Sequence, residues 1–198
     1  MTAVSVLASK VNIAKKEDLS HLNRIYQYLN TTKGKGIVFN AGDTFEVKVF
    51  ADAAYMVHRE RESRSGMVVL INGGVVATNS TKQKHVTKSS TEAELVSLSD
   101  AASWALYASQ LLEGQGIHTT PTIYQDNKSV LSLMTACHNG AKGTKHIEVR
   151  YFFVKQHFKS GKLNVVWCCT NNMLADIMTK PLLGANFRSL RDKIVQSV

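Results

Sequence analysis

The stretch at residues 46–52, Glu-Val-Lys-Val-Phe-Ala-Asp, carries the pattern from which the fold can be predicted. Its side chains alternate with a period of two, which is typical of a half-buried β-strand. One face of this strand is small and apolar, with Val47, Val49 and Ala51, and the other face ends in Asp52. We therefore expect an aspartate at the carboxyl end of the first strand of a sheet.

Two more strands are expected directly after it. Residues 67–71 and 75–78 are apolar and flank Asn72-Gly73-Gly74. Asparagine and glycine accept the positive φ values that a tight hairpin turn requires. The sequence therefore predicts three antiparallel strands.

Helices and strands alternate in the second half of the chain. The spacing predicts a helix over 90–113, ended by Gly114 and Gly116, in which Glu94 lies on the apolar face. Further on we expect strands at 122–124 and 163–168 and helices at 127–135, 145–159 and 172–179. Helices between strands make parallel pairing with the first strand the expected arrangement. The predicted fold class is α/β, with a five-stranded mixed sheet flanked by helices, strands 1–3 antiparallel and strands 4 and 5 parallel to strand 1.

The segment before this pattern is expected to be an extension. Residues 1–14 have no clear period, residues 15–30 have helical spacing, and Lys33-Gly34-Lys35-Gly36 stops the helix. A short strand is expected at 37–39. We predict an N-terminal extension at 1–43 and one main domain at 44–198.

Composition narrows the setting. Lys and Arg exceed Asp and Glu to give a net charge of +9, which either attracts phosphate backbones or merely keeps the protein soluble. The three cysteines, Cys137, Cys168 and Cys169, form no disulfide framework, and a zinc site from them and His138 lacks the usual two-residue gap. With no leader and no long apolar run, we expect a soluble, intracellular protein without a membrane segment.

Four acids occupy four different local contexts: Asp52 and Asp126 end strands, Glu94 opens the long helix, and Asp176 lies in the last predicted helix. Ligand sites in such sheets gather at the carboxyl ends of strands. Carboxylate oxygens are the ligands that Mg²⁺ prefers, together with substrate phosphate. Their convergence would indicate metal-dependent phosphodiester hydrolysis.

Each acid also has a purely structural explanation. Thr91 with Glu94, or Ser89 with Glu92, could form the capping box of the long helix, and only the second frame leaves Glu94 facing inward. Asp126 could be an Asx-type helix cap, Asp176 could lie on a solvated face, and Asp52 could bond to a turn. These alternatives stay open at the level of the sequence.

Seven ordered motifs in about residues 46–192 resemble the ribonuclease H domain of copia-type LTR retrotransposon polyproteins. Residues 15–40 resemble the segment that links reverse transcriptase to this domain. The motifs are Phe50-Ala51-Asp52-Ala53, Arg64-Ser65-Gly66, Thr81-Lys82-Gln83-Lys84, Ser89-Ser90-Thr91-Glu92-Ala93-Glu94, Asp126-Asn127-Lys128-Ser129, the stretch 144–151 (Thr-Lys-His-Ile-Glu-Val-Arg-Tyr) and the stretch 175–182 (Ala-Asp-Ile-Met-Thr-Lys-Pro-Leu).

The resemblance implies a ribonuclease H-like fold and cleavage of the RNA strand of an RNA/DNA hybrid, leaving 5′-phosphate and 3′-hydroxyl ends. It implies two Mg²⁺ ions, for which Mn²⁺ can substitute. Asp52 would bridge both ions, Asp176 would lie near the ion that activates water, and Glu94 and Asp126 would surround the second, with Glu94 near the ribose 2′-hydroxyl. It also implies a reverse transcriptase domain of the same polyprotein as partner, and a cytoplasmic location in a virus-like particle, or a nuclear one.

The chain departs from the family pattern in two places. Ala54 stands where many relatives have a second acid, and residues 169–172 (Cys-Thr-Asn-Asn) contain no histidine where cellular enzymes have one that is thought to help product leave. His146 is the nearest motif histidine and is expected to be structural or to contact phosphate.

Basic stretches flank the acids, and we expect them to contact nucleic acid, although solvated loops are the structural alternative. Trp104 and Trp167 are expected to fill the core. A non-catalytic binding or scaffold module of the same fold, and a transposase or integrase, remain the rival functions. The candidate nucleic-acid-binding residues are Lys82, Lys84, Lys88, Ser90, Asn127, Lys145, His146 and Arg150, in stretches that also contain His85 and Lys142.

Overall fold

The computed structural model describes residues 2–42, 44–56, 63–84, 86–136 and 145–197, and for Lys145 and His146 it describes the backbone alone. Five residues considered from the sequence lie outside this part of the chain, namely His85, Cys137, His138, Lys142 and Thr144.

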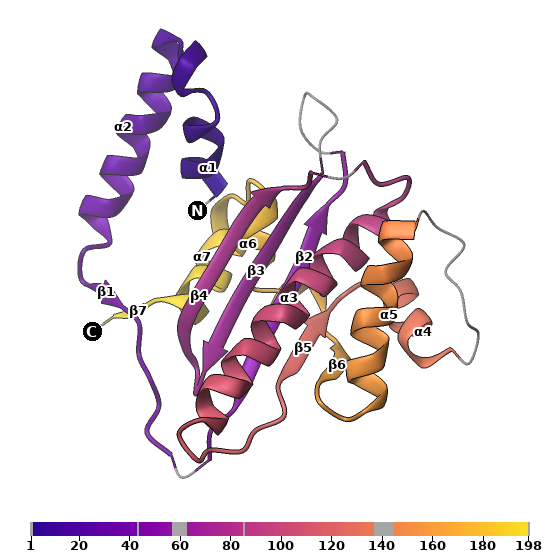
Figure 1. The fold of residues 1–198 in the computed structure, drawn as a ribbon. Helices are drawn as coiled ribbons and strands as arrows, with labels where there is room; N and C mark the ends of the chain where they lie inside the picture. The colour runs from indigo at the N-terminus through magenta and orange to yellow at the C-terminus, as the bar shows by residue number, and fades with distance from the viewer. Residues whose placement is uncertain (1, 43, 57–62, 85, 137–144, 198) are drawn as a thin grey trace.

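The core of the molecule is a five-stranded sheet with the order β4-β3-β2-β5-β6 (Figure 1). Strand β3 (Arg64–Ile71) pairs antiparallel with both of its neighbours, β2 (Val47–Ala54) and β4 (Gly74–Lys82). Strands β5 (Thr122–Gln125) and β6 (Asn164–Trp167) run parallel to β2. The predicted ribonuclease H-like sheet, with its mixture of antiparallel and parallel strands, is therefore confirmed.

The β3–β4 turn has the predicted chemistry. Asn72 and Gly73 have φ values of +49° and +80°, so both central residues adopt the left-handed region that a two-residue hairpin turn needs. The carbonyl of Asn72 also accepts a hydrogen bond from the Asn40 N–H at 3.0 Å, which ties the preceding segment to this turn.

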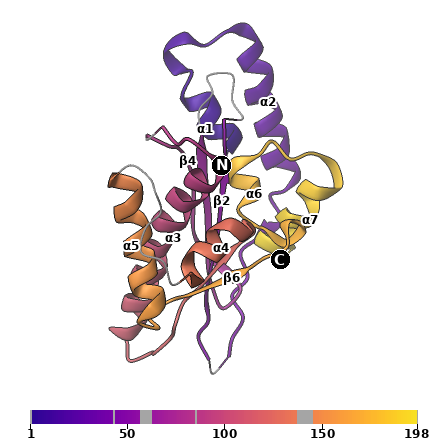
Figure 2. The same ribbon diagram turned by 90° about the vertical axis from the view of Figure 1, so that its right-hand side faces the viewer.

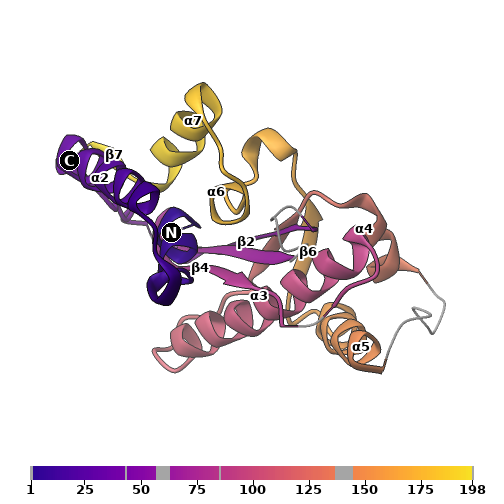
Figure 3. The ribbon, with the colours of Figure 1, turned by 90° about the horizontal axis from the view of Figure 1, so that it is seen from above.

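Helices cover both faces of the sheet, so the domain has three layers (Figures 2 and 3). On one face lie α3 (Ser90–Glu113), α4 (Lys128–Thr135) and α5 (Lys145–Lys159). Their buried side chains meet the inward residues of β2 in the main hydrophobic core, which includes Val49, Leu98 and Tyr151. On the other face, α6 (Asp176–Thr179) and α7 (Gly184–Ile194) pack over β3 and β4 through Val68, Met178 and Leu190.

The C-terminal part differs from the prediction. The helix expected over 172–179 is divided into a 3-10 turn, η2 (Thr170–Asn172), and the one-turn helix α6, and α7 was not predicted. The strand expected at 37–39 is also wrong, because the pairing lies earlier, between β1 (Lys35–Gly36) and β7 (Gln196–Ser197) near the C-terminus. The β1–β7 pair and the position of α6 depend on contacts between segments far apart in the chain. Such contacts cannot be predicted from the local pattern of residues.

The N-terminal extension contains α1 (Thr2–Ala8), η1 (Val11–Ile13) and α2 (Lys16–Thr31), of which α2 agrees with the predicted helix within one residue. Helix α2 projects beyond the sheet (Figure 1), and its apolar residues Leu19, Tyr26 and Leu29 are exposed. Helix α1 contacts the main domain, because the Thr2 hydroxyl donates to the Ile177 carbonyl at 2.6 Å. Among the described helices, none combines the length and the apolar character needed to cross a membrane.

Candidate active site

Asp52 lies near the carboxyl end of β2 and its side chain is 1% exposed. It belongs to the polar face of the strand, because the alternating residues Val47, Val49 and Ala51 pack into the core. The Ser97 hydroxyl donates to the Asp52 carbonyl at 2.8 Å and so joins β2 to α3. The carboxylate accepts a hydrogen bond from the Thr179 hydroxyl on α6. Asp52 is thus held by contacts with both helical layers.

Glu94 lies in the second turn of α3 and faces the sheet. Ser89 is the N-cap, since its hydroxyl accepts a hydrogen bond from the Glu92 N–H at 3.2 Å, and Glu92 in turn accepts from the Lys88 N–H at 2.7 Å. The capping frame that frees Glu94 is therefore the one present. The buried Glu94 carboxylate accepts a hydrogen bond from the Gln125 side-chain amide at 3.4 Å.

Asp126 directly follows β5, and the capping role open to it is filled by its neighbour. The Asn127 side chain caps α4 by accepting from the Ser129 and Val130 N–H groups at 2.9 and 3.3 Å. Asp126 instead accepts a hydrogen bond from the Thr170 hydroxyl at 3.1 Å. Its own N–H donates to Gln125 Oε1 at 2.8 Å, so Gln125 contacts both Asp126 and Glu94.

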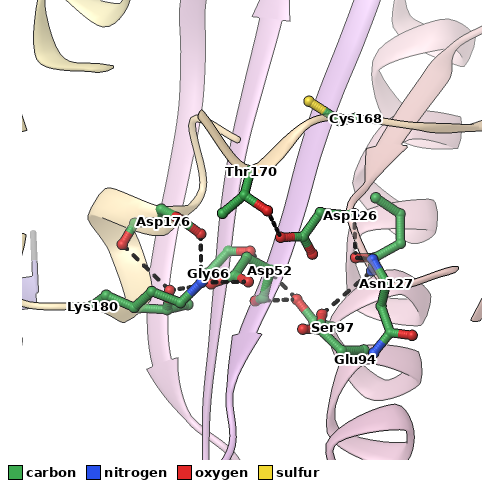
Figure 4. Close-up of polar contacts among 12 residues, drawn as sticks. Asp52, Gly66, Glu94, Ser97, Asp126, Asn127, Cys168, Thr170, Asp176 and Lys180 are labelled. Atoms are coloured by element: carbon green, nitrogen blue, oxygen red, sulfur yellow. Dashed lines mark hydrogen bonds and ion pairs between the residues drawn. The ribbon is translucent and has the colours of Figure 1, made fainter. Parts of the chain in front are cut away.

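These three acids meet at one point at the end of the sheet (Figure 4). Asp52, Glu94 and Asp126 each offer a carboxylate oxygen, and the three oxygens lie within 4.8 Å of one another. Burial, and then the charges of Asp52 and Asp126, raise the pKa of Glu94 from 4.5 to about 9. The three carboxylate oxygens are the kind of donor that divalent cations such as Mg²⁺ prefer, and little positive charge lies between them to offset their own. The cluster therefore fits a divalent cation.

Asp176 lies at the start of α6, 5% exposed, and is joined to Asp52 by a lysine. The Lys180 ammonium lies 2.7 Å from Asp176 Oδ1 and 3.3 Å from Asp52 Oδ1 (Figure 4). Burial raises the pKa of Asp176 to about 6 even though the Lys180 hydrogen bond opposes that shift. Burial lowers the pKa of Lys180, but Asp52 and Asp176 together raise it above its ordinary value. Asp176 therefore belongs to the same site through a bridging cation.

Lys180 and Thr179 are site residues that the sequence reasoning missed. Lys180 follows Asp176 by four residues, which is the spacing at which opposite charges meet on a helix. That spacing was a signal that could have led to Lys180. The Thr179–Asp52 bond spans 127 positions in the chain and had no local signal.

The position of α6 depends on its close approach to the sheet at Gly66 and on a hydrogen bond from Ser80, which we call the polar brace. A Cβ added at Gly66 on β3 would lie 2.6 Å from Thr179 Cγ2 and 2.9 Å from the Ala175 carbonyl oxygen, so only glycine admits the helix there. On the other side, the buried Ser80 hydroxyl donates to the Met178 carbonyl at 2.6 Å. An isolated helix of one turn is not stable in water, so these contacts place Asp176.

The buried Arg64 side chain connects this brace to the N-terminal extension. Its guanidinium donates to the Ser80 carbonyl at 3.1 Å and to the Ser5 hydroxyl of α1 at 2.9 Å. Since Ser80 also holds the Met178 carbonyl, α1 supports the strand that supports α6. The extension is thus linked to the position of Asp176 by hydrogen bonds.

The candidate nucleic-acid-binding residues differ in their surroundings. Lys82, Lys84, Lys88 and Ser90 are exposed, around the segment that leads into α3. Arg150 pairs with Asp100 at 2.5 Å, and Asn127 caps α4, so both have structural partners. Lys145 and His146 begin α5.

The prediction that both tryptophans fill the core is wrong. Trp104 is 43% exposed on the outer side of α3, and Trp167 is 53% exposed at the end of the edge strand β6. The apolar periodicity of the sequence did not predict the exposure of these two side chains. Whether a side chain on an edge strand or on the side of a helix is buried depends on which other elements pack beside it. The adjacent Cys168 and Cys169 are free thiols that belong to no metal-ligand group in the described part of the chain.

Comparisons with known proteins place the chain among retrotransposon polyproteins. It is 34% identical over 197 residues to the retrovirus-related Pol polyprotein from transposon RE1 of Arabidopsis thaliana, covering 97% of this chain and 13% of that protein. It is 29% identical over 194 residues to the corresponding polyprotein from transposon TNT 1-94 of Nicotiana tabacum, covering 97% of this chain and 14% of that protein. No family model matches the sequence.

Among solved structures, the N-terminal RNase H domain of Rv2228c from Mycobacterium tuberculosis is similar, with a TM-score of 0.49 and 18% identity over 74% of this chain and 99% of that one. LC11-RNase H1 in complex with an RNA/DNA hybrid has a TM-score of 0.48 and 13% identity, covering 67% of this chain and 93% of that one. By its sequence relatives, the chain is homologous to one part of the Pol polyproteins of copia-type retrotransposons and spans 13% of the length of the RE1 protein, and by the strand order of its sheet it has the ribonuclease H fold.

Proposed function

We propose that the chain is a metal-dependent endoribonuclease that hydrolyses the RNA strand of RNA/DNA hybrids during retrotransposon reverse transcription. The observation that carries this proposal is the convergence of Asp52, Glu94 and Asp126 within 4.8 Å, with Asp176 joined to Asp52 through Lys180. These carboxylates come from β2, α3, the end of β5 and α6, so no local structural need brings them together.

The proposed cofactor is a pair of Mg²⁺ ions, with Mn²⁺ as a substitute. Asp52 with Glu94 and Asp126 would hold one ion, and Asp52 with Asp176 the other, so that Asp52 contributes to both. Bound ions of this kind stabilise the charge that develops on the attacking and leaving oxygens of an in-line displacement. The products would be a 5′-phosphate and a 3′-hydroxyl.

The residues of the chain orient the carboxylates and balance their charge. The Gln125 side chain donates a hydrogen bond to Glu94 and accepts one from the Asp126 backbone N–H, and so fixes the positions of these two acids relative to each other. Thr170 and Thr179 direct one oxygen each of Asp126 and Asp52 by donating hydrogen bonds. Lys180 supplies the positive charge that lets Asp52 and Asp176 approach each other before substrate and ions arrive.

Selection of RNA is assigned to Glu94. Glu94 lies in the second turn of α3, four residues after the exposed Ser90, which together with the exposed Lys88 would border the substrate. A group that accepts a hydrogen bond from the ribose 2′-hydroxyl distinguishes RNA from DNA at that nucleotide. The exposed lysines 82, 84 and 88 would contact phosphates on the same side.

The proposed partners are the hybrid and the reverse transcriptase domain of the same polyprotein. The RE1 relative is a Pol polyprotein of which this chain spans 13%, so a longer protein is the proposed setting. An intracellular location, in the cytoplasm within a virus-like particle or in the nucleus, follows as part of the same proposal.

Cleavage of a labelled RNA/DNA hybrid tests the proposal. We expect cleavage of the RNA strand with Mg²⁺ or Mn²⁺, none with EDTA, and none in the Asp126→Asn variant. Asp18→Asn is the matched control, because Asp18 lies on α2 in an ion pair with Lys10 at 2.8 Å. Equal cleavage with EDTA or by Asp126→Asn would refute a metal-dependent site, and hybrid binding without cleavage under either ion would support the non-catalytic scaffold instead.

A further inference from the structure

A hollow of about 530 Å³ opens on the face of the sheet opposite α3, next to the edge strand β6. Lys48 and Phe50 of β2 and Tyr124 of β5 line it, and these residues alternate with core residues that face α3. Trp167, Asn172 and Lys193 are also among the lining residues. The volume of this β6 hollow is in the range of pockets that bind small organic ligands.

Aromatic side chains line the β6 hollow. Phe50 and Tyr124 are stacked, with ring centroids 4.7 Å apart and an interplanar angle of 13°. Trp167, at the end of β6, is 53% exposed, so part of its indole ring can be reached from solvent. An exposed indole offers an apolar ring surface on which another planar ring can stack.

The charge around these rings is positive. Lys48 and Lys193 line the hollow, and the Lys128 ammonium lies 5.7 Å from the centroid of the Trp167 ring. Lys193 donates to the neutral Asn172 side chain at 2.7 Å, and Lys48 pairs with the exposed Glu46 at 2.8 Å. Among the described residues that line the hollow, none is acidic. Aromatic rings combined with lysines are the features that bind single-stranded nucleic acid, through base stacking and phosphate contacts.

The β6 hollow lies beside the candidate active site. Trp167 is the register partner of Gln125, whose next residue is Asp126, and neighbouring strands lie about 4.8 Å apart. Cys169 lines the hollow, and the next residue, Thr170, donates to the Asp126 carboxylate at 3.1 Å. A nucleic acid strand with one phosphate at the acids would thus have neighbouring nucleotides beside the hollow.

We propose that the β6 hollow binds an unpaired nucleotide of a nucleic acid strand that extends from the acidic site, with its base stacked on Trp167 and its phosphate near Lys193. The nucleotide must be unpaired, because the bases within a duplex do not expose a ring face to a side chain. The identity of the strand rests on the proposed function, but the stacking site itself does not require cleavage. The protein would then prefer a hybrid that ends in a single-stranded tail over a blunt hybrid.

Fluorescence of Trp167 provides a direct test, because the chain contains two tryptophans. In the full chain carrying Trp104→Phe, Trp167 is the only indole. We expect a tailed RNA/DNA hybrid, added in EDTA so that no cleavage occurs, to quench this fluorescence, and a blunt hybrid of the same duplex to leave it unchanged. In the converse variant, Trp167→Phe, the remaining Trp104 on α3 should report no quenching.

Affinity measurements complete the test. Trp167→Leu should weaken binding of the tailed hybrid by about tenfold and leave binding of the blunt hybrid within about twofold, since stacking on one base contributes that order of affinity. Trp104→Leu is the matched control, because this tryptophan is similarly exposed on another surface, and its tailed-hybrid affinity should stay unchanged. Lys193→Gln should weaken tailed-hybrid binding and reduce its dependence on salt.

Equal quenching by both hybrids, no quenching by either, or an unchanged preference for the tail in Trp167→Leu would overturn the assignment. Because these measurements need neither ions nor cleavage, they are separable from the proposed activity. An inactive protein that still shows the tail-dependent quenching would refute the ribonuclease function and keep the stacking site.

Discussion

Lys180 is expected to act as a built-in substitute for a divalent cation, and replacing it by methionine tests this. The substitution keeps most of the side-chain volume and removes the ammonium that lies 2.7 Å from Asp176 and 3.3 Å from Asp52. Without ions, the two carboxylates would then face each other with side chains only 7% and 1% exposed. We expect a less stable protein that binds a divalent cation more tightly.

The magnitude follows from the burial of the three groups. An exposed ion pair contributes about 0.2–1 kcal/mol, whereas removing one partner of a buried pair costs about 3–5 kcal/mol. Because the Lys180 side chain is 34% exposed while its partners are buried, we expect an intermediate loss of about 2 kcal/mol. For a chain of this size that corresponds to a melting temperature lower by about 4–8 °C in EDTA.

Ion binding should change in the opposite direction. In the native protein an arriving cation must displace the ammonium from the carboxylates, and in Lys180→Met it need not. The dissociation constant for Mn²⁺ should therefore fall by about tenfold, which corresponds to about 1.4 kcal/mol. The melting temperature of Lys180→Met should accordingly rise more on addition of Mn²⁺ than that of the native protein.

Differential scanning fluorimetry and calorimetric titration of Mn²⁺ measure both effects. Lys10→Met is the matched control, because Lys10 forms an ion pair of similar length, 2.8 Å, with Asp18 outside the sheet. Because this pair is exposed to solvent, that variant should lose much less stability than Lys180→Met and bind Mn²⁺ as the native protein does. If Lys180→Met were as stable as the native protein in EDTA, or bound Mn²⁺ more weakly, the substitute role would be refuted.

Three further predictions concern the acids and the support of α6. The pKa of Glu94 is raised from 4.5 to about 9, so between these pH values the folded state holds a proton that the unfolded state releases. Without divalent ions, the free energy of unfolding should therefore fall with rising pH, by at most about 1.4 kcal/mol per pH unit. Urea unfolding of Glu94→Gln should show a weaker dependence of this free energy on pH. Asp126→Asn removes one like charge from the site, so it should abolish cleavage while stability in EDTA stays constant or rises by about 1 kcal/mol, and a large drop in its melting temperature would contradict a clustered site. Gly66→Ala would place a methyl group 2.6 Å from Thr179 Cγ2 and displace α6, which should lower stability by about 1–3 kcal/mol and remove most of the hydrolytic activity. Gly34→Ala is the control, because no atom lies within 4 Å of the added methyl group, and it should change neither stability nor activity. A fully active Gly66→Ala would show that the position of α6 is not needed.

The elements that the sequence predicted well have local causes. The bounds of α3 and α5 agree with the predicted ranges, because a cap or a glycine stop limits each helix within a few residues of its end. The hairpin at Asn72-Gly73 follows from the positive φ values that these residues tolerate. The five strands follow from period-two alternation or short apolar runs.

The elements that the sequence did not reveal have distant causes. Helix α6 is one turn long and depends on the space above Gly66 and on the Ser80 hydroxyl. The β1–β7 pair joins segments at opposite ends of the chain. The exposure of Trp167 depends on β6 being an edge strand, and the order of strands in a sheet is a property of the whole fold.

From the sequence we could derive the order of helices and strands, the acids that stand at their ends, and the family resemblance that the ordered motifs carry. The packed fold was needed to show that Ser89 caps α3 and leaves Glu94 free, that Asn127 caps α4 and leaves Asp126 free, and that Lys180 joins Asp52 to Asp176. The difference comes from the distance along the chain over which each kind of interaction acts. Helix and strand propensities and helix caps act over a few residues. The electrostatic interaction of two carboxylates depends instead on their distance in space. Asp52 and Asp176 are 124 positions apart in the chain, so they interact only after the strands and helices that carry them have packed together.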